Sequence, residues 1–211
     1  MFLPKHLSIW FQTIQLWLKM VNEESAILKY LIENKEKKFS INQIAKARTI
    51  NYKSAYQNVQ KLEKRGVIST EKLGNVTLCS FNYRFDSLVF AVEEKRRKDI
   101  RKNKKINAVC RRLSEIENPF FIALLFGSYA SGKQTKHSDI DLLVIVNDKK
   151  LYEKIKLQLR ILPVDVHLSE FSTEEVRLML KSKEFSVIEE VKKNNVILFG
   201  IGGYYNLIKN V

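Results

Sequence analysis

The sequence predicts an α+β fold in two domains, and three observations carry that prediction. Residues 22–85 show helix patterns followed by a hairpin pattern, whereas residues 118–200 contain apolar strands separated by polar turns. Charge is unevenly distributed: residues 1–90 carry 14 basic and 7 acidic side chains, residues 91–117 carry 10 and 5, and residues 118–211 carry 13 and 11. We therefore expect domains at 1–90 and 118–211, joined by a basic helical linker at 91–117.

The composition of the 211 residues excludes several classes of protein. Hydrophobic residues make up 45%, so the chain can bury a core and is neither a disordered tail nor a low-complexity fibre. Cys79 and Cys110 are far apart and lack a CxxC pattern, which argues against a disulfide framework and a zinc site. The formal charge of +14 makes a polyanion an expected partner, and we expect a cytoplasmic protein.

Residues 7–21 form the most apolar stretch near the start of the chain. Polar residues interrupt this stretch, and it is shorter than the ~20 apolar residues that a bilayer span needs, so we expect no membrane segment. Apolar residues recur at spacings of three and four and include Trp10 and Trp17, which predicts an amphipathic helix. We expect this helix to pack in the core or at a homodimer contact; a membrane-surface anchor is the weaker alternative, because the helix carries few cations.

Three further helices are expected, at residues 23–34, 41–47 and 52–65. Ser40 and Asn51 stand directly before the second and third of them, as N-cap residues do. The third helix has an apolar stripe on one side and polar, amide-rich and basic residues on the rest. Its sequence therefore predicts an exposed surface with positive charge.

A β-hairpin is expected after the third helix, with strands at residues 66–70 and 76–80 and Gly74-Asn75 at its tip. The helices and the hairpin together resemble the winged helix-turn-helix family of transcriptional regulators over about residues 22–85. The phrase LEKRGVIST is similar to the end of the recognition helix and the first wing strand in that family. The resemblance implies binding to double-stranded DNA and transcription regulation; a protein-interaction role is the alternative.

In that family the third helix reads base edges and the wing touches the backbone or the minor groove. The resemblance implies a DNA-binding surface of seven residues. Those expected near bases are Lys53, Ser54, Tyr56 and Gln57, and those expected near phosphates are Lys61, Lys64 and Lys72. In the linker that follows, apolar residues at helix spacing predict one or two helices; their cations either lie along DNA phosphates or form a solvated face.

The C-terminal part contains two apolar strands with a polar turn between them. The first strand, at residues 120–126, runs into Gly127-Ser128, and the second, at residues 139–146, begins with Asp139-Ile140-Asp141. Two carboxylates two positions apart on a strand share one face, about 7 Å apart, and repel each other unless a cation lies between them. Carboxylate oxygens suit Mg²⁺, and a glycine-serine turn offers N–H groups and a hydroxyl to phosphates.

The stretch GSYASGKQTKHSDIDLLVIV resembles the nucleotidyltransferase superfamily of DNA polymerase beta, whose signature is Gly-Ser, a spacer and Asp-x-Asp on a strand. It looks most like the minimal nucleotidyltransferases, which include the antitoxin partners of HEPN-type toxins. The resemblance covers about residues 118–200. It implies a nucleotidyltransferase fold with a small mixed sheet flanked by helices, a two-metal Mg²⁺ site, a nucleoside triphosphate substrate, and a HEPN-type toxin as a possible partner.

The resemblance also implies roles for individual residues. The catalytic carboxylates that hold the metal are expected to be Asp139, Asp141 and Asp165; the nucleotide is expected at Gly127, Ser128, Ser131 and Lys133. Many minimal members have arginine where this chain has Tyr129 and Ser131, so a phosphate-binding cation is missing unless Lys133 or Lys136 replaces it. We expect transfer of a nucleoside monophosphate from an NTP, with ATP favoured, to a hydroxyl. A domain that only senses a nucleotide is the alternative.

Overall fold

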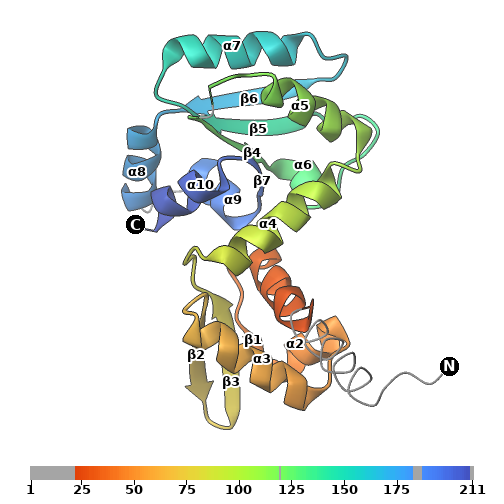
Figure 1. Cartoon of the computed structure of the whole chain (residues 1–211), viewed down its shortest axis with the longest axis vertical. Helices are drawn as coiled ribbons and strands as arrows, with labels where there is room; N and C mark the ends of the chain where they lie inside the picture. Colours follow the sequence, from red (N-terminus) through yellow and green to blue (C-terminus); the bar gives the residue numbers. More distant parts are fainter. Residues whose placement is uncertain (1–21, 119, 183–186, 210–211) are drawn as a thin grey trace, which may run out of the picture. The chain divides into compact units, whose positions relative to one another are not determined.

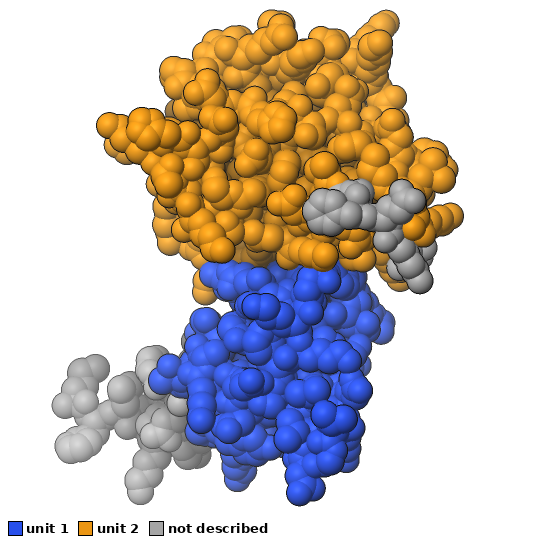
Figure 2. All heavy atoms as spheres, turned by 180° about the vertical axis from the view of Figure 1, so that it is seen from behind, with its two compact units in different colours: residues 1–84 blue, residues 85–211 orange. Residues whose placement is uncertain are grey.

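A computed structural model of the chain describes residues 22–118, 120–182 and 187–209 (Figure 1). The chain divides into two compact units, Met1–Arg84 and Phe85–Val211 (Figure 2). The helix expected around Trp10 and Trp17 lies outside the described residues, so its homodimer contact stays a prediction. Within the described ranges, no helix is long and apolar enough to cross a membrane.

The first unit combines three helices with a small antiparallel sheet. A helix over residues 22–33 is followed by β1 (Phe39–Ser40), α2 (Ile41–Arg48), α3 (Tyr52–Lys64), β2 (Ile68–Leu73) and β3 (Val76–Phe81). The strand β3 lies between β1 and β2 and pairs with both. Aliphatic side chains from all three helices are completely buried in the core, including Ile27, Leu28, Leu31, Ile44 and Leu62.

Side-chain caps explain where α2 and α3 begin. The Ser40 hydroxyl accepts a bond from the backbone N–H of Gln43, and the Gln43 side chain accepts one from the Ser40 N–H at 2.8 Å, which completes a capping box. The Asn51 side chain accepts a bond from the Ser54 N–H at 2.8 Å. Both predicted N-caps are confirmed. The predicted hairpin is present with Gly74 at a φ of +59° beside the terminal pair, but its first strand covers residues 68–73 instead of 66–70.

The second unit is built on a four-stranded mixed sheet. Its helices are α4 (Ser87–Ile100), α5 (Lys104–Ser114), α6 (Gly127–Ala130), α7 (Lys149–Arg160), α8 (Thr173–Ser182), α9 (Val187–Lys193) and α10 (Ile201–Ile208). Its strands are β4 (Ile122–Leu125), β5 (Ile140–Ile145), β6 (Val166–Phe171) and β7 (Val196–Phe199). The strand order is β6-β5-β4-β7, with β5 and β6 parallel and the other neighbours antiparallel. The predicted small mixed sheet flanked by helices is confirmed.

Alternate residues of the central strands enter different layers of the second unit. Ile140, Leu142 and Val144 of β5 belong to one buried cluster with the apolar faces of α5 and α7. On the other face, Ile122 of β4 lies close to Gly203, which lets α10 pack against β4 and β7. The sheet is therefore covered by α5 and α7 on one side and by α10 on the other.

The basic segment expected between the two domains is part of the second unit. The boundary between the units falls at residues 84 and 85, because α4 begins at Ser87 and packs against β7. Ile106, Val109 and Leu113 of α5 are buried in the main core of the unit. The apolar spacing predicted one or two helices; two are present, and they belong to the unit of residues 85–211.

A buried ionic network joins α4 to the C-terminal helix. Glu93 is completely buried and Arg96 is 6% exposed, and their side chains pair at 2.6 Å. Arg96 also donates to the backbone carbonyl of Asn195 at 2.6 Å, and the Tyr205 hydroxyl donates to Glu93 at 2.7 Å. Burial, reinforced by the Glu93 carboxylate, raises the pKa of Tyr205 well above its ordinary value, so the phenol keeps its proton. Tyr204 is buried as well, so both tyrosine side chains of α10 pack in the interior of the second unit.

Candidate active site

Three carboxylates lie at the end of the sheet where β5 and β6 begin. The first paired residues of these parallel strands are Ile140 and Val166, and the Ile140 N–H donates to the Asp165 carbonyl at 2.9 Å. Asp139 and Asp165 each stand one position before that pair. Asp141 stands one position after it, opposite His167. Because side chains alternate between faces, Asp139 and Asp141 belong to the face opposite the one that α5 and α7 cover. Asp165 precedes β6 and lines a cavity with residues of α7.

Gly127 packs against the Asp141 side chain of this site. Its φ is +66°, a region that favours glycine, and a Cβ at this position would lie 2.2 Å from Oδ2 of Asp141. The Phe126 N–H donates to the Asp141 carbonyl at 3.0 Å, which extends the pairing of β4 with β5 up to the glycine. The Asp141 side chain is 27% exposed. The glycine-serine turn and the Asp-x-Asp strand therefore meet directly.

The other residues expected to bind nucleotide follow Gly127 along α6. The Ser131 hydroxyl donates to the carbonyls of Gly127 at 3.0 Å and Ser128 at 3.1 Å. It therefore links the C-terminal end of α6 to the first two residues of that helix. The Lys133 N–H donates to the Ser128 carbonyl at 2.9 Å, while its side chain is exposed. Ser128 is half-buried at the start of α6. The Ser131 hydroxyl thus has a structural task in addition to the predicted contact with a phosphate.

Tyr129 occupies a position where many minimal nucleotidyltransferases have arginine, and here it is a core residue. It is 2% exposed and belongs to the apolar cluster beneath the sheet. Its hydroxyl lies 3.5 Å from the Ser138 carbonyl, next to Asp139. The side chain therefore anchors the loop that leads to the first carboxylate, and cannot serve as a cation for phosphate.

His167 lies beside Asp141, and two cations of α7 lie near Asp165. Nδ1 of His167 lies 3.4 Å from Oδ1 of Asp141, and the imidazole is 71% exposed. Asp165 lines a cavity of about 440 Å³ together with Lys156 and Arg160. The sequence analysis did not select these α7 residues, although their spacing of four on one helix face was a signal that could have found them.

The donor chemistry at this end of the sheet suits a hard cation. Asp139, Asp141 and Asp165 offer only carboxylate oxygens, which Mg²⁺ prefers, and all three are at least partly exposed. Within the described ranges, however, no three His, Cys, Asp or Glu side chains are gathered closely enough to hold a metal ion. The two-metal site stays a prediction.

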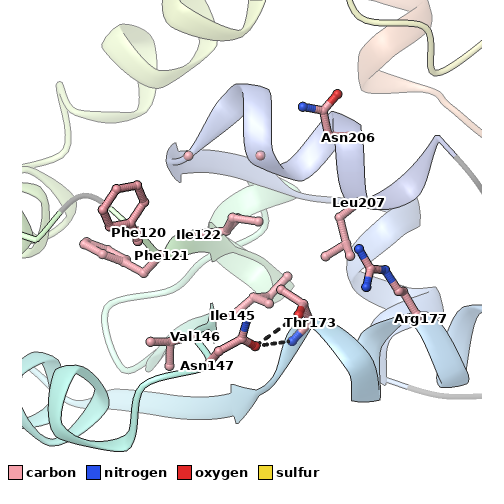
Figure 3. Close-up of a pocket in the computed structure, with 12 residues that line it drawn as sticks. Phe120, Phe121, Ile122, Ile145, Val146, Asn147, Thr173, Arg177, Asn206 and Leu207 are labelled. Atoms are coloured by element: carbon pink, nitrogen blue, oxygen red, sulfur yellow. Dashed lines mark hydrogen bonds between the residues drawn. The ribbon is translucent and has the colours of Figure 1, made fainter.

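A second cavity, of about 450 Å³, lies at the opposite end of the sheet (Figure 3). It is formed by the start of β4, the end of β5, and parts of α8 and α10. The Asn147 side chain accepts bonds from the N–H and hydroxyl of Thr173 at 2.9 and 3.0 Å, which caps α8. Arg177 pairs with Glu174 at 3.6 Å. Asn147, Thr173 and Arg177 thus interact at α8, and the described lining of this cavity includes none of the three carboxylates.

In the first unit, α3 presents most of the residues expected to contact DNA. The exposed residues of α3 include five of those expected to contact DNA, Lys53, Tyr56, Gln57, Lys61 and Lys64, and Lys72 is exposed on β2. Tyr52, which the sequence analysis did not select, is 57% exposed and stacks near Tyr56 with ring centroids 6.4 Å apart. The exposed part of α3 therefore carries basic, amide and aromatic side chains together with the acidic Glu63.

Ser54 departs from the expectation that it lies near bases. Its hydroxyl donates to the Glu23 carboxylate of the first helix, and the Asn58 amide donates to the same oxygen at 3.3 Å. Asn58 is only 2% exposed, although it is one of the amide residues on the helix side that the sequence predicts to be exposed. The two residues are four apart and share the face of α3 that packs inside the unit. Ser54 and Asn58 therefore face the interior of the unit, where the Glu23 carboxylate accepts their hydrogen bonds.

Three comparisons relate the chain to known proteins. No curated protein matches the sequence. A solved structure described as "Crystal structure of the toxin-antitoxin with AMP-PNP" contains a chain that is 22% identical, with a TM-score of 0.32. The alignment covers 49% of this chain and 80% of that one. Residues 102–198, from the start of α5 to β7, match the family model of the nucleotidyltransferase domain.

Proposed function

We propose that the second unit transfers a nucleoside monophosphate from an NTP, with ATP as the expected donor, to a hydroxyl group. The hydroxyl oxygen forms a bond to the α-phosphorus, and the bond from that phosphorus to the oxygen that bridges to the β-phosphorus breaks. Pyrophosphate leaves with that electron pair, and the hydroxyl proton passes to a base. The match of residues 102–198 to a nucleotidyltransferase domain supports a reaction of this class.

The observation that carries the proposal is the shared position of Asp139, Asp141 and Asp165 at one end of the sheet, with Gly127 against Asp141. Asp139 and Asp141 would hold Mg²⁺, which supplies positive charge to the phosphate oxygens when bound. Asp165 stands on the neighbouring strand, where it would hold a metal ion or accept the proton of the acceptor. Ser128 and the backbone of Gly127 would contact the terminal phosphates.

The test separates transfer from nucleotide sensing. The full chain is incubated with each NTP labelled at the α-phosphate, Mg²⁺ and a panel of acceptors, and covalent label on an acceptor is measured beside released pyrophosphate. We expect label and pyrophosphate in equal amounts. Tight NTP binding without label on any acceptor would contradict nucleotidyl transfer and favour a domain that only senses a nucleotide. The resemblance of the motif to antitoxin nucleotidyltransferases makes a HEPN-type toxin one protein to include among the acceptors.

We also propose that the first unit is a winged helix-turn-helix that binds double-stranded DNA. Its order of helices and hairpin, together with the exposed cations of α3 and β2, supports this assignment. Ser54 provides a control for Lys53, its neighbour on α3. The Ser54 hydroxyl donates to Glu23 within the unit, whereas the Lys53 side chain is exposed and available to DNA.

Replacing Lys53 and Lys64 by glutamine is expected to lower the affinity for a 30-base-pair duplex by roughly tenfold or more. Loss of the one phosphate contact expected of Lys64 should also reduce the slope of log K against log salt by about one. Ser54→Ala should leave the affinity unchanged within about twofold and instead lower the free energy of unfolding by roughly 1 kcal/mol, because it removes a hydrogen bond to a carboxylate. Fluorescence anisotropy and urea denaturation measure the two effects. Salt-independent binding of the unmodified protein would contradict the DNA assignment.

A further inference from the structure

The strand β6 is the last strand at one end of the second sheet. It pairs with β5 over its whole length of six residues, in one continuous register. The Ile140 N–H donates to the Asp165 carbonyl and the Val146 N–H donates to the Phe171 carbonyl, both at 2.9 Å. The odd-numbered residues along this segment therefore direct their backbone groups toward β5.

Three residues of β6 direct their backbone N–H and C=O groups to the outside of the sheet. They are Val166, Leu168 and Glu170, because the residues of a paired strand alternate in the side to which their backbone groups point. No backbone bond from another described part of the chain reaches these groups. The strand also lacks the proline, the lysine and the bulge that commonly protect an exposed edge. This edge of the sheet can therefore pair with a further strand.

The terminal strand at the other end of the sheet, β7, is covered by a helix. The helix α4 packs against β7, and Arg97 donates to the Leu198 carbonyl at 3.3 Å. Arg96 donates at 2.6 Å to the carbonyl of Asn195, the residue directly before β7. The fold thus protects one terminal strand and leaves the other open. Because open edges are prone to pair with other chains, this difference indicates that β6 has a partner.

A cavity of about 440 Å³ adjoins β6 and has an excess of positive charge. It lies between α7, which contributes Lys156 and Arg160, and β6, which contributes Val166 and Leu168. Figure 1 shows α7 alongside β6. Asp165 is the only acidic residue of the described lining. The cavity therefore offers apolar surface to the stem of a side chain and a cation to a carboxylate.

We infer that β6 pairs with β6 of a second copy of this chain, antiparallel and about a two-fold axis at Leu168. The inference concerns assembly and does not rest on the proposed reaction. In this register Val166 stands opposite Glu170 of the second copy. Each pair of outward residues exchanges two hydrogen bonds, about six in all. An axis at His167 or Ser169 would leave one outward residue of each β6 unpaired.

The charges of the two copies complement each other in this register. Glu170 is exposed and shares the α7 side of β6 with Val166, because the two residues are four apart on a strand. Its place opposite Val166 of the other copy puts it at the cavity that Arg160 and Lys156 line. The two-fold axis repeats this contact. Backbone pairing alone suits any extended strand, and the position of Glu170 is what favours a second copy.

The pairing also adds residues of the second copy beside the candidate active site. His167 stands opposite Asp141 within one copy. Ser169 of the second copy stands opposite His167 in the inferred register, and Phe171 of the second copy stands opposite Asp165. Side chains that are opposite each other on neighbouring strands are in contact distance. The two sites therefore flank the two-fold axis, and each gains side chains from the other copy.

The test is a disulfide cross-link at position 168 of the full chain. In the L168C variant the two engineered thiols meet at the axis, where Cα atoms about 5.5 Å apart suit a disulfide. The control is N206C on α10, because Asn206 is exposed whereas Leu168 is half-buried, so random collision favours the control. Both native cysteines are buried, and the unmodified protein gives the background. Oxidation by diamide is followed on non-reducing gels, and circular dichroism checks folding.

The L168C variant is expected to cross-link at least about tenfold faster than N206C, because association raises the effective concentration of its thiols. Adding Glu170→Lys should slow the cross-link about tenfold, since it puts a cation against Arg160 twice in each dimer. Adding Arg160→Glu as well should restore most of the rate, because the two charges are then exchanged. Glu190→Lys makes the same change of charge at an exposed position of α9 and should alter the rate less than about twofold.

Cross-linking of L168C no faster than N206C would overturn the inference and leave β6 to a strand of another protein. Equal slowing by Glu170→Lys and Glu190→Lys would reduce the effect to net charge and would overturn it too. Sedimentation of Glu170→Lys, with and without Arg160→Glu, makes the same comparison with Leu168 in place. The single variant should dissociate at about tenfold higher concentration than the double variant, and equal dissociation of the two would contradict the pairing. The cross-link reports on position 168, so a dimer formed through another surface does not satisfy the test.

Discussion

Replacing Asp141 by asparagine is expected to lower the rate of nucleotidyl transfer by about a thousandfold. Asp141 is the carboxylate that the fold holds most firmly, since it lies within β5 and packs against Gly127. Asparagine keeps the size and removes the charge that would hold Mg²⁺. Loss of several kcal/mol of charge stabilisation in the transition state corresponds to this change in rate. Steady-state release of pyrophosphate, measured at saturating NTP and acceptor, provides the check.

Two further variants separate chemistry from folding. Glu153→Gln makes the same exchange of carboxylate for amide at an exposed position of α7 and should leave the rate within about twofold. Gly127→Ala keeps every carboxylate, but its Cβ would overlap the Asp141 side chain, so we expect the rate to fall while the Asp141 charge remains. If Asp141→Asn transferred nucleotide as fast as Glu153→Gln, the assignment of Asp141 as a metal ligand would be wrong.

Local sequence patterns predicted most of the elements, because caps and turns depend on neighbouring residues. Ser40 and Asn51 cap the helices that they were expected to cap, and Gly74 lies at the tip of the hairpin. The contact of Gly127 with Asp141 follows from the antiparallel pairing of β4 and β5, two strands that are consecutive in the sequence. These features need no information about distant parts of the chain.

The remaining features depend on long-range pairing, which one sequence does not reveal. The parallel register that puts His167 opposite Asp141 is a relation between two strands that α7 separates. Ser54 looked like an outward polar residue until Glu23 of another helix supplied a partner. Likewise, α4 looked like part of a linker because it is rich in cations, whereas Glu93 and Arg96 are buried within the second unit.

That buried pair leads to the largest expected change in stability. Glu93→Ala is expected to lower the free energy of unfolding of the second unit by roughly 3–5 kcal/mol, because it leaves the buried Arg96 cation without its carboxylate. The Tyr205 hydroxyl would lose its acceptor as well. Urea denaturation followed by far-UV circular dichroism measures the difference. The neighbouring Glu94→Ala serves as a control: Glu94 pairs with Arg97 at a partly exposed site, so its loss should cost less than about 1 kcal/mol.

The double variant Glu93→Met with Arg96→Met shows whether the cost comes from an uncompensated charge. Two apolar side chains of similar volume remove both charges together, and such replacements of buried ion pairs are often neutral. We therefore expect the double variant to be more stable than Glu93→Ala. In the cycle with the single variants Glu93→Met and Arg96→Met, the coupling energy should be about 1–3 kcal/mol. If Glu93→Ala and Glu94→Ala destabilised the protein equally, burial of the pair would not be the source of the effect. The docking of α10 through Tyr205 would then depend on its apolar contacts alone.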